Sequence, residues 1–166
     1  GSSESGASLP TQAGKIYIAQ TDGTYPKKIL DTRISDLEIS WPIKDKIAFS
    51  TPNAEIFLLT EEGKLTKLLE PKPGLSTKWS TNGTKLLFSY VIDFNNPVAS
   101  LWLKDVESKS EKDLNVPTVA SKCTWSIDGV TIFCAVAKTP SVDDIYQINT
   151  VDGSQKLIAE PNMPVG

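Results

Sequence analysis

The amino-acid sequence predicts an all-β protein built from repeated four-stranded antiparallel sheets. The first observation is a pattern that occurs four times. An alternating apolar strand carries an aromatic residue at its third position, and a polar turn and a lysine-bearing strand follow it. The four segments are 15–30, 55–69, 100–114 and 144–158, and their aromatic residues are Tyr17, Phe57, Trp102 and Tyr146. Apolar alternation on both sides of a short turn is typical of a β-hairpin.

The second observation is another kind of hairpin between these segments, at 37–50, 76–89 and 121–135. A tryptophan closes the first strand of each, and a short turn and an apolar strand follow. These residues are Trp41, Trp79 and Trp125, which are 38 and 46 positions apart. One four-stranded unit of a repeat protein occupies about 40–50 residues, so each pair of hairpins makes one sheet. No window shows a persuasive helical period.

Four-stranded sheets repeated at this spacing are the blades of a β-propeller. A β-sandwich or an irregular meander also has short strands and frequent turns. A sandwich has no reason to reuse one aromatic position at regular intervals, so the pattern favours the propeller. A closed propeller has about four to eight blades. This chain provides three full blades and one half blade, and we therefore expect an incomplete propeller, an open arc.

The expected domain organisation follows the repeat. Residues 1–13 are rich in Gly and Ser, which predicts a flexible linker or cloning remnant and a piece of a longer protein. The expected units are a half blade at 14–32, blades at 33–71, 72–116 and 117–160, and a tail at 161–166.

The stretches "WSTNGTKLLFS", "WSIDGVTIFC" and "WPIKDKIAFS" resemble the TolB-type, WD40-like β-propeller repeat. That repeat reads Trp-Ser-Pro-Asp-Gly, then a basic residue, an apolar strand and a strand of Ile-Tyr type. The resemblance covers about residues 15–160 and departs from the pattern at Pro42, Thr81 and Ile127. It implies a propeller fold and a place among bacterial surface or periplasmic proteins. The motif is structural and identifies no ligand.

The motif has a physical reason in its turns and tryptophans. Asn82-Gly83 and Asp128-Gly129 provide the positive φ angles that a tight hairpin needs. Trp79 and Trp125 are expected to bury against the next blade.

Composition excludes several classes of function. The net charge is −3 with both signs interleaved, which indicates no nucleic-acid partner, and the apolar stretches are too short for a membrane span. The chain has no histidine, which removes the commonest general base and zinc ligand. We therefore expect no enzyme activity, cofactor or metal. The carboxylates at 61–62, Asp93 and 143–144 lack the spacing of a calcium loop and are interpreted as solvated turn residues.

Both cysteines flank one turn. With Asp128-Gly129 at its centre, Cys123 lies opposite Cys134, as Ile39 lies opposite Phe49 and Thr77 opposite Phe88 in the other blades. A cross-strand pair is close enough for a disulfide. The sequence favours a structural disulfide over two reduced core thiols, and a disulfide implies an oxidising compartment, periplasmic or at the cell surface.

Binding residues are expected on the loops of a rigid scaffold. The long loops predicted at 89–100 and 135–144 are the candidates, above all Tyr90, Asp93, Phe94, Asn95 and Asn96. In the alternative interpretation, Phe94 is covered by its own loop.

Because the ends of the arc are open, we also expect a protein partner or self-association. The function hypothesis is a non-catalytic module for protein interaction or assembly. The alternatives are an accessory or gating propeller of a larger hydrolase, such as a peptidase, and a small-ligand-binding propeller.

Overall fold

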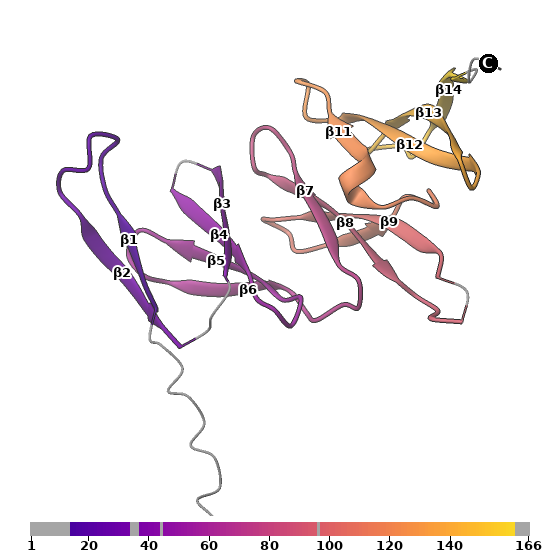
Figure 1. Cartoon of the computed structure of the whole chain (residues 1–166). Helices are drawn as coiled ribbons and strands as arrows, with labels where there is room; N and C mark the ends of the chain where they lie inside the picture. Colours follow the sequence, from indigo (N-terminus) through magenta and orange to yellow (C-terminus); the bar gives the residue numbers. More distant parts are fainter. Residues whose placement is uncertain (1–13, 34–36, 44, 96, 162–166) are drawn as a thin grey trace, which may run out of the picture.

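The computed structural model describes residues 14–33, 37–43, 45–95 and 97–161. The described strands form four antiparallel sheets that follow one another along an open arc (Figure 1). The first sheet has two strands, β1 (Gly14–Ile18) and β2 (Lys27–Thr32), and the other three have four each. The all-β prediction, with three full blades and a half blade, is confirmed.

Within each full blade the strands are hydrogen-bonded in chain order. The first full blade contains β3 (Glu38–Ile43), β4 (Lys46–Ser50), β5 (Ile56–Thr60) and β6 (Leu65–Leu69). The second contains β7 (Ser76–Trp79), β8 (Lys85–Val91), β9 (Ala99–Asp105) and β10 (Glu111–Asp113). The third contains β11 (Cys123–Trp125), β12 (Thr131–Thr139), β13 (Val142–Asn149) and β14 (Gln155–Ala159). A 3-10 turn, η1 (Ala120–Lys122), precedes β11.

The predicted register of the tryptophan hairpins is observed in all three blades. Ile39 pairs with Phe49, Thr77 with Phe88, and Cys123 with Cys134. Local turn chemistry accounts for this register in the second and third blades, since Gly83 and Gly129 have φ angles of +67° and +66°.

Asp128 organises the turn of the third blade. Its Oδ1 accepts hydrogen bonds from the backbone N–H groups of Thr131 (2.8 Å) and Val130 (2.9 Å). These bonds, that from Thr131 foremost, hold the pKa of the Asp128 carboxyl below its usual value.

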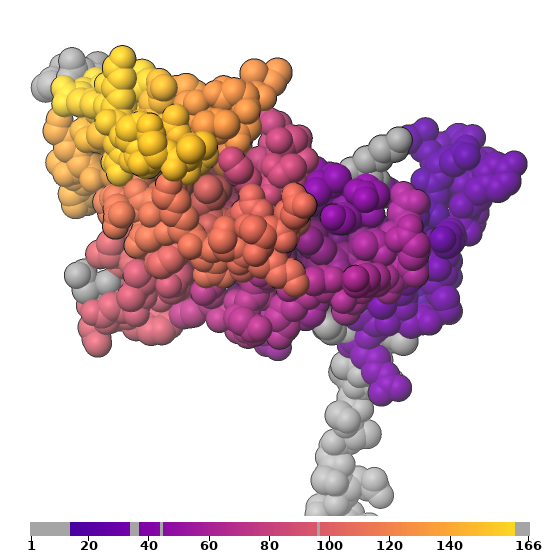
Figure 2. Space-filling model, turned by 180° about the vertical axis from the view of Figure 1, so that it is seen from behind, coloured from indigo at the N-terminus to yellow at the C-terminus, as the bar shows by residue number. Residues whose placement is uncertain are grey.

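Adjacent sheets pack face to face through apolar side chains. Because successive side chains of a strand point to opposite faces, one strand contributes to the interfaces on both sides of its sheet. In β4, Ile47 and Phe49 face the half blade, whereas Ala48 faces the second blade. In β8, Phe88 faces the first blade and Leu87 the third. Figure 2 shows the resulting row, in which each sheet borders only its neighbours in the chain.

Two expectations need correction. Trp79 and Trp125 pack against the preceding blade, not the next one: Trp79 belongs to the cluster shared with the first blade and Trp125 to that shared with the second. The loop expected at 135–144 is mostly strand, since β12 and β13 continue to a turn at Pro140 and Ser141. The strands extend because alternate side chains of 131–139 still find cross-strand partners.

The third-position aromatics also face the preceding sheet. Phe57, Trp102 and Tyr146 each lie against the core cluster that joins their blade to the one before it, while Tyr17 is exposed. Trp41 is likewise exposed, on β3.

Candidate functional site

One end of the strands carries the candidate site. In the first two full blades the connection from the second to the third strand and the connection to the next blade both lie at this end. We call it the loop face and define it by 51–55, 70–75, 92–95 and 97–98. The tight turns of the tryptophan hairpins lie at the opposite end.

An apolar loop projects from the loop face between β8 and β9. Ile92 and Val98 are exposed, and Phe94 is 74% exposed. The Asp93 carboxylate accepts a hydrogen bond from the Asn95 N–H at 2.9 Å and shapes the turn that presents Phe94. Phe94 is therefore not covered by its own loop. Asn96, the remaining predicted contact, lies outside the described residues.

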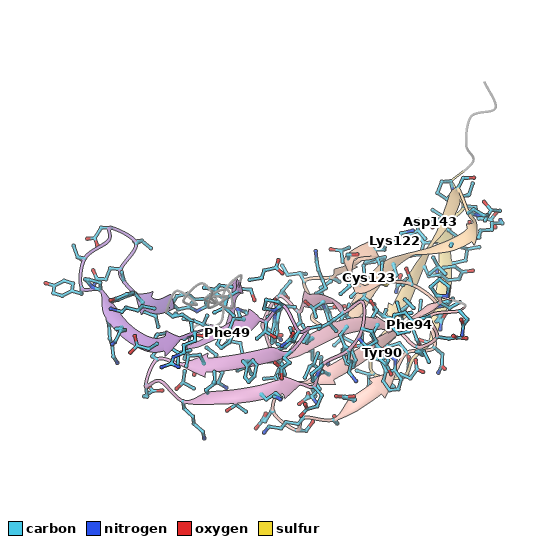
Figure 3. All side chains as sticks on the ribbon, turned by 60° about the horizontal axis from the view of Figure 1, so that its bottom comes forward. Phe49, Tyr90, Phe94, Lys122, Cys123 and Asp143 are labelled. Atoms are coloured by element: carbon cyan, nitrogen blue, oxygen red, sulfur yellow. A yellow bond between two sulfur atoms is a disulfide. The ribbon has the colours of Figure 1, made fainter. Side chains whose placement is uncertain are left out.

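Tyr90 has a different environment from the loop residues that follow it. It lies in β8, where its ring stacks on Phe88 with centroids 6.2 Å apart. Lys72 Nζ lies 4.6 Å from the centroid of the Tyr90 ring, within the range of a cation–π contact. Figure 3 shows Tyr90 and Phe94 in the same part of the second blade. Tyr90 thus anchors the base of the loop, and Phe94 is the residue that a partner can reach.

A backbone contact ties the apolar loop to the neighbouring connection. The Val91 N–H donates to the Pro73 carbonyl at 2.9 Å. Gly74 sits so close to Val91 that a Cβ at this position would lie 2.9 Å from the valine Cγ2, and its φ is +63°. The segment around Gly74 therefore holds the start of the loop in place.

A hollow of about 440 Å³ opens on the loop face between the first and second blades. A second hollow of about 240 Å³ continues from it between β3 and β7, and the two share Glu38 and Thr77. The residues lining the first include Glu38, Thr51, Pro52, Leu75, Ser76 and Thr77.

The seam between the second and third blades is bridged instead. The Ser121 N–H donates to Ser76 Oγ at 3.1 Å, and Trp125 Nε1 donates to the Lys78 carbonyl at 3.3 Å. These two hydrogen bonds tie the second blade to the third.

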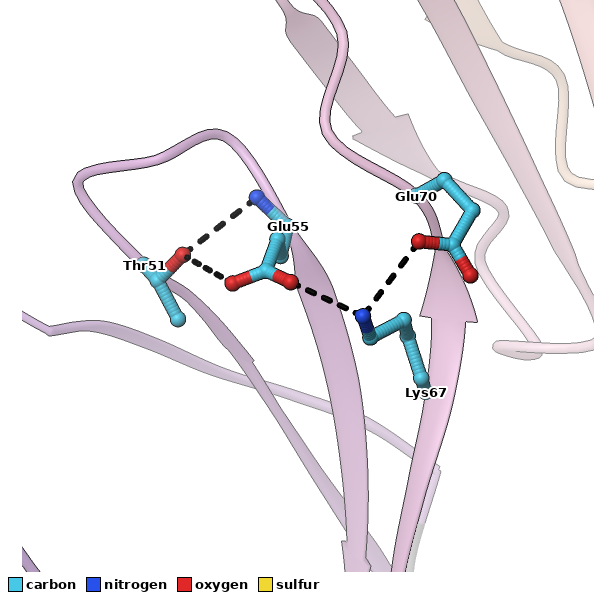
Figure 4. Close-up of polar contacts among 4 residues, drawn as sticks. All are labelled: Thr51, Glu55, Lys67 and Glu70. Carbon is cyan, nitrogen blue, oxygen red and sulfur yellow. Dashed lines mark hydrogen bonds and ion pairs between the residues drawn. The ribbon is translucent and has the colours of Figure 1, made fainter.

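A series of polar side-chain contacts borders the hollow (Figure 4). Thr51 Oγ1 accepts from the Glu55 N–H and donates to Glu55 Oε2, each at 3.4 Å. Lys67 Nζ lies 2.9 Å from Glu55 Oε1 and 3.3 Å from Glu70 Oε2. The hydrogen bond to Glu55, and then that to Glu70, raises the pKa of Lys67 above its usual value. These hydrogen bonds and ion pairs fix the 51–55 loop at the rim of the hollow.

Two of the carboxylates considered for calcium lie near lysines. Asp143 pairs with Lys122 at 2.8 Å, and Asp144 lies 3.7 Å from Lys138 Nζ. Residues 61–62 lie in the turn after β5. Across the described ranges, no group of three or more His, Cys, Asp or Glu side chains is gathered for a metal ion.

The cysteines lie in the core and not on the loop face. Cys123 and Cys134 form a disulfide, with Cα atoms 4.1 Å apart, inside the cluster between the second and third blades. The bridge therefore links the first two strands of the last blade and takes no part in the candidate site.

Sequence reasoning missed the hollow and the anchoring role of Tyr90. The hollow depends on how two blades diverge, which no local pattern encodes. The Lys72 contact could have been suspected only from the proline-rich stretch "EPKPG", which forces an extended connection beside β8.

Comparison with known proteins shows the fold. No family model matches the chain, and no curated protein sequence matches it. TolB from Acinetobacter baumannii is similar in structure with a TM-score of 0.60, at 22% identity over 89% of this chain and 38% of that one. An oligogalacturonate lyase in complex with manganese gives a TM-score of 0.69, at 17% identity over 93% of this chain and 44% of that one.

An acylaminoacyl peptidase from Pyrococcus horikoshii gives a TM-score of 0.60, at 17% identity over 89% of this chain and 28% of that one. The chain thus spans less than half the length of these three structures. This chain has a TolB-like β-propeller fold. The similar structures include both TolB and enzymes. No helix among the described residues is long and apolar enough to cross a membrane.

Proposed function

We propose that this chain is a non-catalytic β-propeller module that binds a protein partner outside the cytoplasm, through its loop face. The observation that carries the proposal is the apolar loop, where Ile92, Phe94 and Val98 are exposed together. Clustered exposed apolar side chains on a rigid scaffold are typical of a protein-binding surface. The hollow beside Leu75 gives the same face a depression into which a partner side chain fits.

The partner is reached by photo-crosslinking. Phe94 is replaced by p-benzoylphenylalanine in the protein expressed in its own cells. The matched control places the same residue at Ile127, which is 95% exposed but lies in a tight turn at the opposite end of the strands.

We expect a discrete crosslinked product from position 94 that is absent from position 127. The product is expected to disappear when Ile92 and Val98 are changed to serine. Equal products from both positions, or none from either, would contradict the proposal.

The disulfide supports the location outside the cytoplasm, since such bonds persist in oxidising compartments. Thiol alkylation of intact cells tests this part. We expect Cys123 and Cys134 to resist alkylation until a reductant is added, whereas two alkylated cysteines before reduction would place the chain in a reducing compartment.

A second function has one observation in its favour. The fold is similar to that of an acylaminoacyl peptidase of which this chain covers 28%. An accessory or gating propeller of a larger hydrolase would be followed, in the parent sequence, by a catalytic domain with a nucleophile elbow and a histidine. Sequencing the parent gene separates the two functions.

A further inference from the structure

The same combination of residues recurs in the core clusters at the three interfaces between consecutive sheets. An apolar residue on the last strand of one sheet, or directly after that strand, belongs to the same core cluster as the third-position aromatic of the next sheet. The pairs are Ile29 with Phe57, Leu68 with Trp102, and Leu114 with Tyr146.

Strand register identifies the corresponding residue at the C-terminal end of the arc. Phe57 pairs with Lys67, and Leu68 follows Lys67. Likewise Tyr146 pairs with Leu157, and Ile158 follows Leu157. Ile158 is therefore the counterpart of Leu68.

At each end of the arc, one residue of this pair lacks its partner among the described residues. Ile158 is 47% exposed, whereas Leu68 and Leu114 are 4% and 2% exposed. At the other end Tyr17, the counterpart of Trp102, is 53% exposed. The C-terminal end of the arc exposes the apolar residue of the pair, and the N-terminal end exposes the aromatic residue. The two ends are therefore complementary.

We propose that a second copy of this chain covers the exposed face of the last blade, in a head-to-tail contact that seats Tyr17 of one copy on Ile158 of the other. The contact continues an interface that the molecule already builds three times. Figure 2 shows the two sheets concerned at opposite ends of the row, so both are accessible at once. A head-to-tail contact joins different surfaces of the two copies and can extend into a chain or close into a ring.

This inference does not rest on the proposed function, because its contact residues lie at the ends of the arc and not on the loop face. It is tested on the purified chain by sedimentation equilibrium. We expect the average mass to rise with protein concentration.

Ile158→Lys and Tyr17→Lys each remove one side of the contact. Both residues are exposed, so we expect each variant to fold, and far-UV circular dichroism checks this. We expect each variant alone to be monomeric. A mixture of the two retains one intact Tyr17 face and one intact Ile158 face and is expected to form a dimer but no larger species. Ile127→Lys is the matched control and is expected to leave association unchanged.

Two results would overturn the proposal. A wild-type chain that stays monomeric at every concentration would assign the end faces to other blades. Variants that still associate alone, or whose mixture stays monomeric, would show that the contact is not head-to-tail through these residues.

Discussion

Reduction of the Cys123–Cys134 disulfide removes a covalent link between two residues that are 11 positions apart in the last blade. The bridge stabilises the fold mainly by restricting the unfolded chain. On the chain-entropy model, a closed loop of this length contributes about 3 kcal/mol. For a chain of this size, each kcal/mol shifts the melting temperature by about 2–4 °C, so we expect reduction to lower it by about 6–12 °C.

Tryptophan fluorescence is the appropriate assay, because Trp125 is buried in the same cluster as both cysteines. Thermal unfolding is recorded with and without a reductant, and thiols are titrated in each sample. The Cys123→Ala/Cys134→Ala variant is the control, and we expect the reductant to leave its melting temperature unchanged.

The reasoning is refuted if the wild-type protein, with two titrated thiols after reduction, melts at the same temperature as before. An equal shift in the control variant would refute it too, since the reductant would then act elsewhere.

Three further outcomes are expected. Phe88→Ala empties a fully buried position in the centre of the arc and should cost about 3–5 kcal/mol in urea unfolding; a cost below 1 kcal/mol would show that the cluster collapses to fill the space. Gly83→Ala should destabilise the fold strongly, because the added Cβ meets the Pro42 carbonyl, whereas Gly153→Ala, with a similar φ but open space around it, should cost less; equal costs in urea unfolding would refute the steric argument. Asp128→Asn should lower stability at neutral pH, where the carboxylate is charged and hydrogen-bonded to its own turn. Since the pKa of Asp128 is lowered in the fold, this contribution is present above the unfolded value of about 4 and is lost as the pH falls through the lower folded value; urea midpoints of the two proteins should therefore converge in acid, and parallel pH profiles would contradict this.

Much of the candidate site could be predicted in outline. The apolar loop was identified from its length and its aromatic residue, because a connection that exceeds a tight turn must leave the sheet. The exposure of Phe94 could not be predicted, since the same sequence fits a ring packed under its own loop. The Asn95 N–H bond to Asp93, which turns the backbone outward, exists only in the folded loop.

The sequence by itself determined most of the strands, the hairpin register and the number of blades among the described residues. Each of these depends on neighbours a few residues apart: apolar alternation selects the strand, and a turn with a positive-φ glycine aligns Cys123 with Cys134. Only the tertiary structure decided which side of a blade each tryptophan covers, where the hollow opens, and that Ile158 is exposed while Leu68 is buried. Those outcomes depend on contacts between blades, and two residues in the same repeat position differ in burial according to whether a described sheet packs against them.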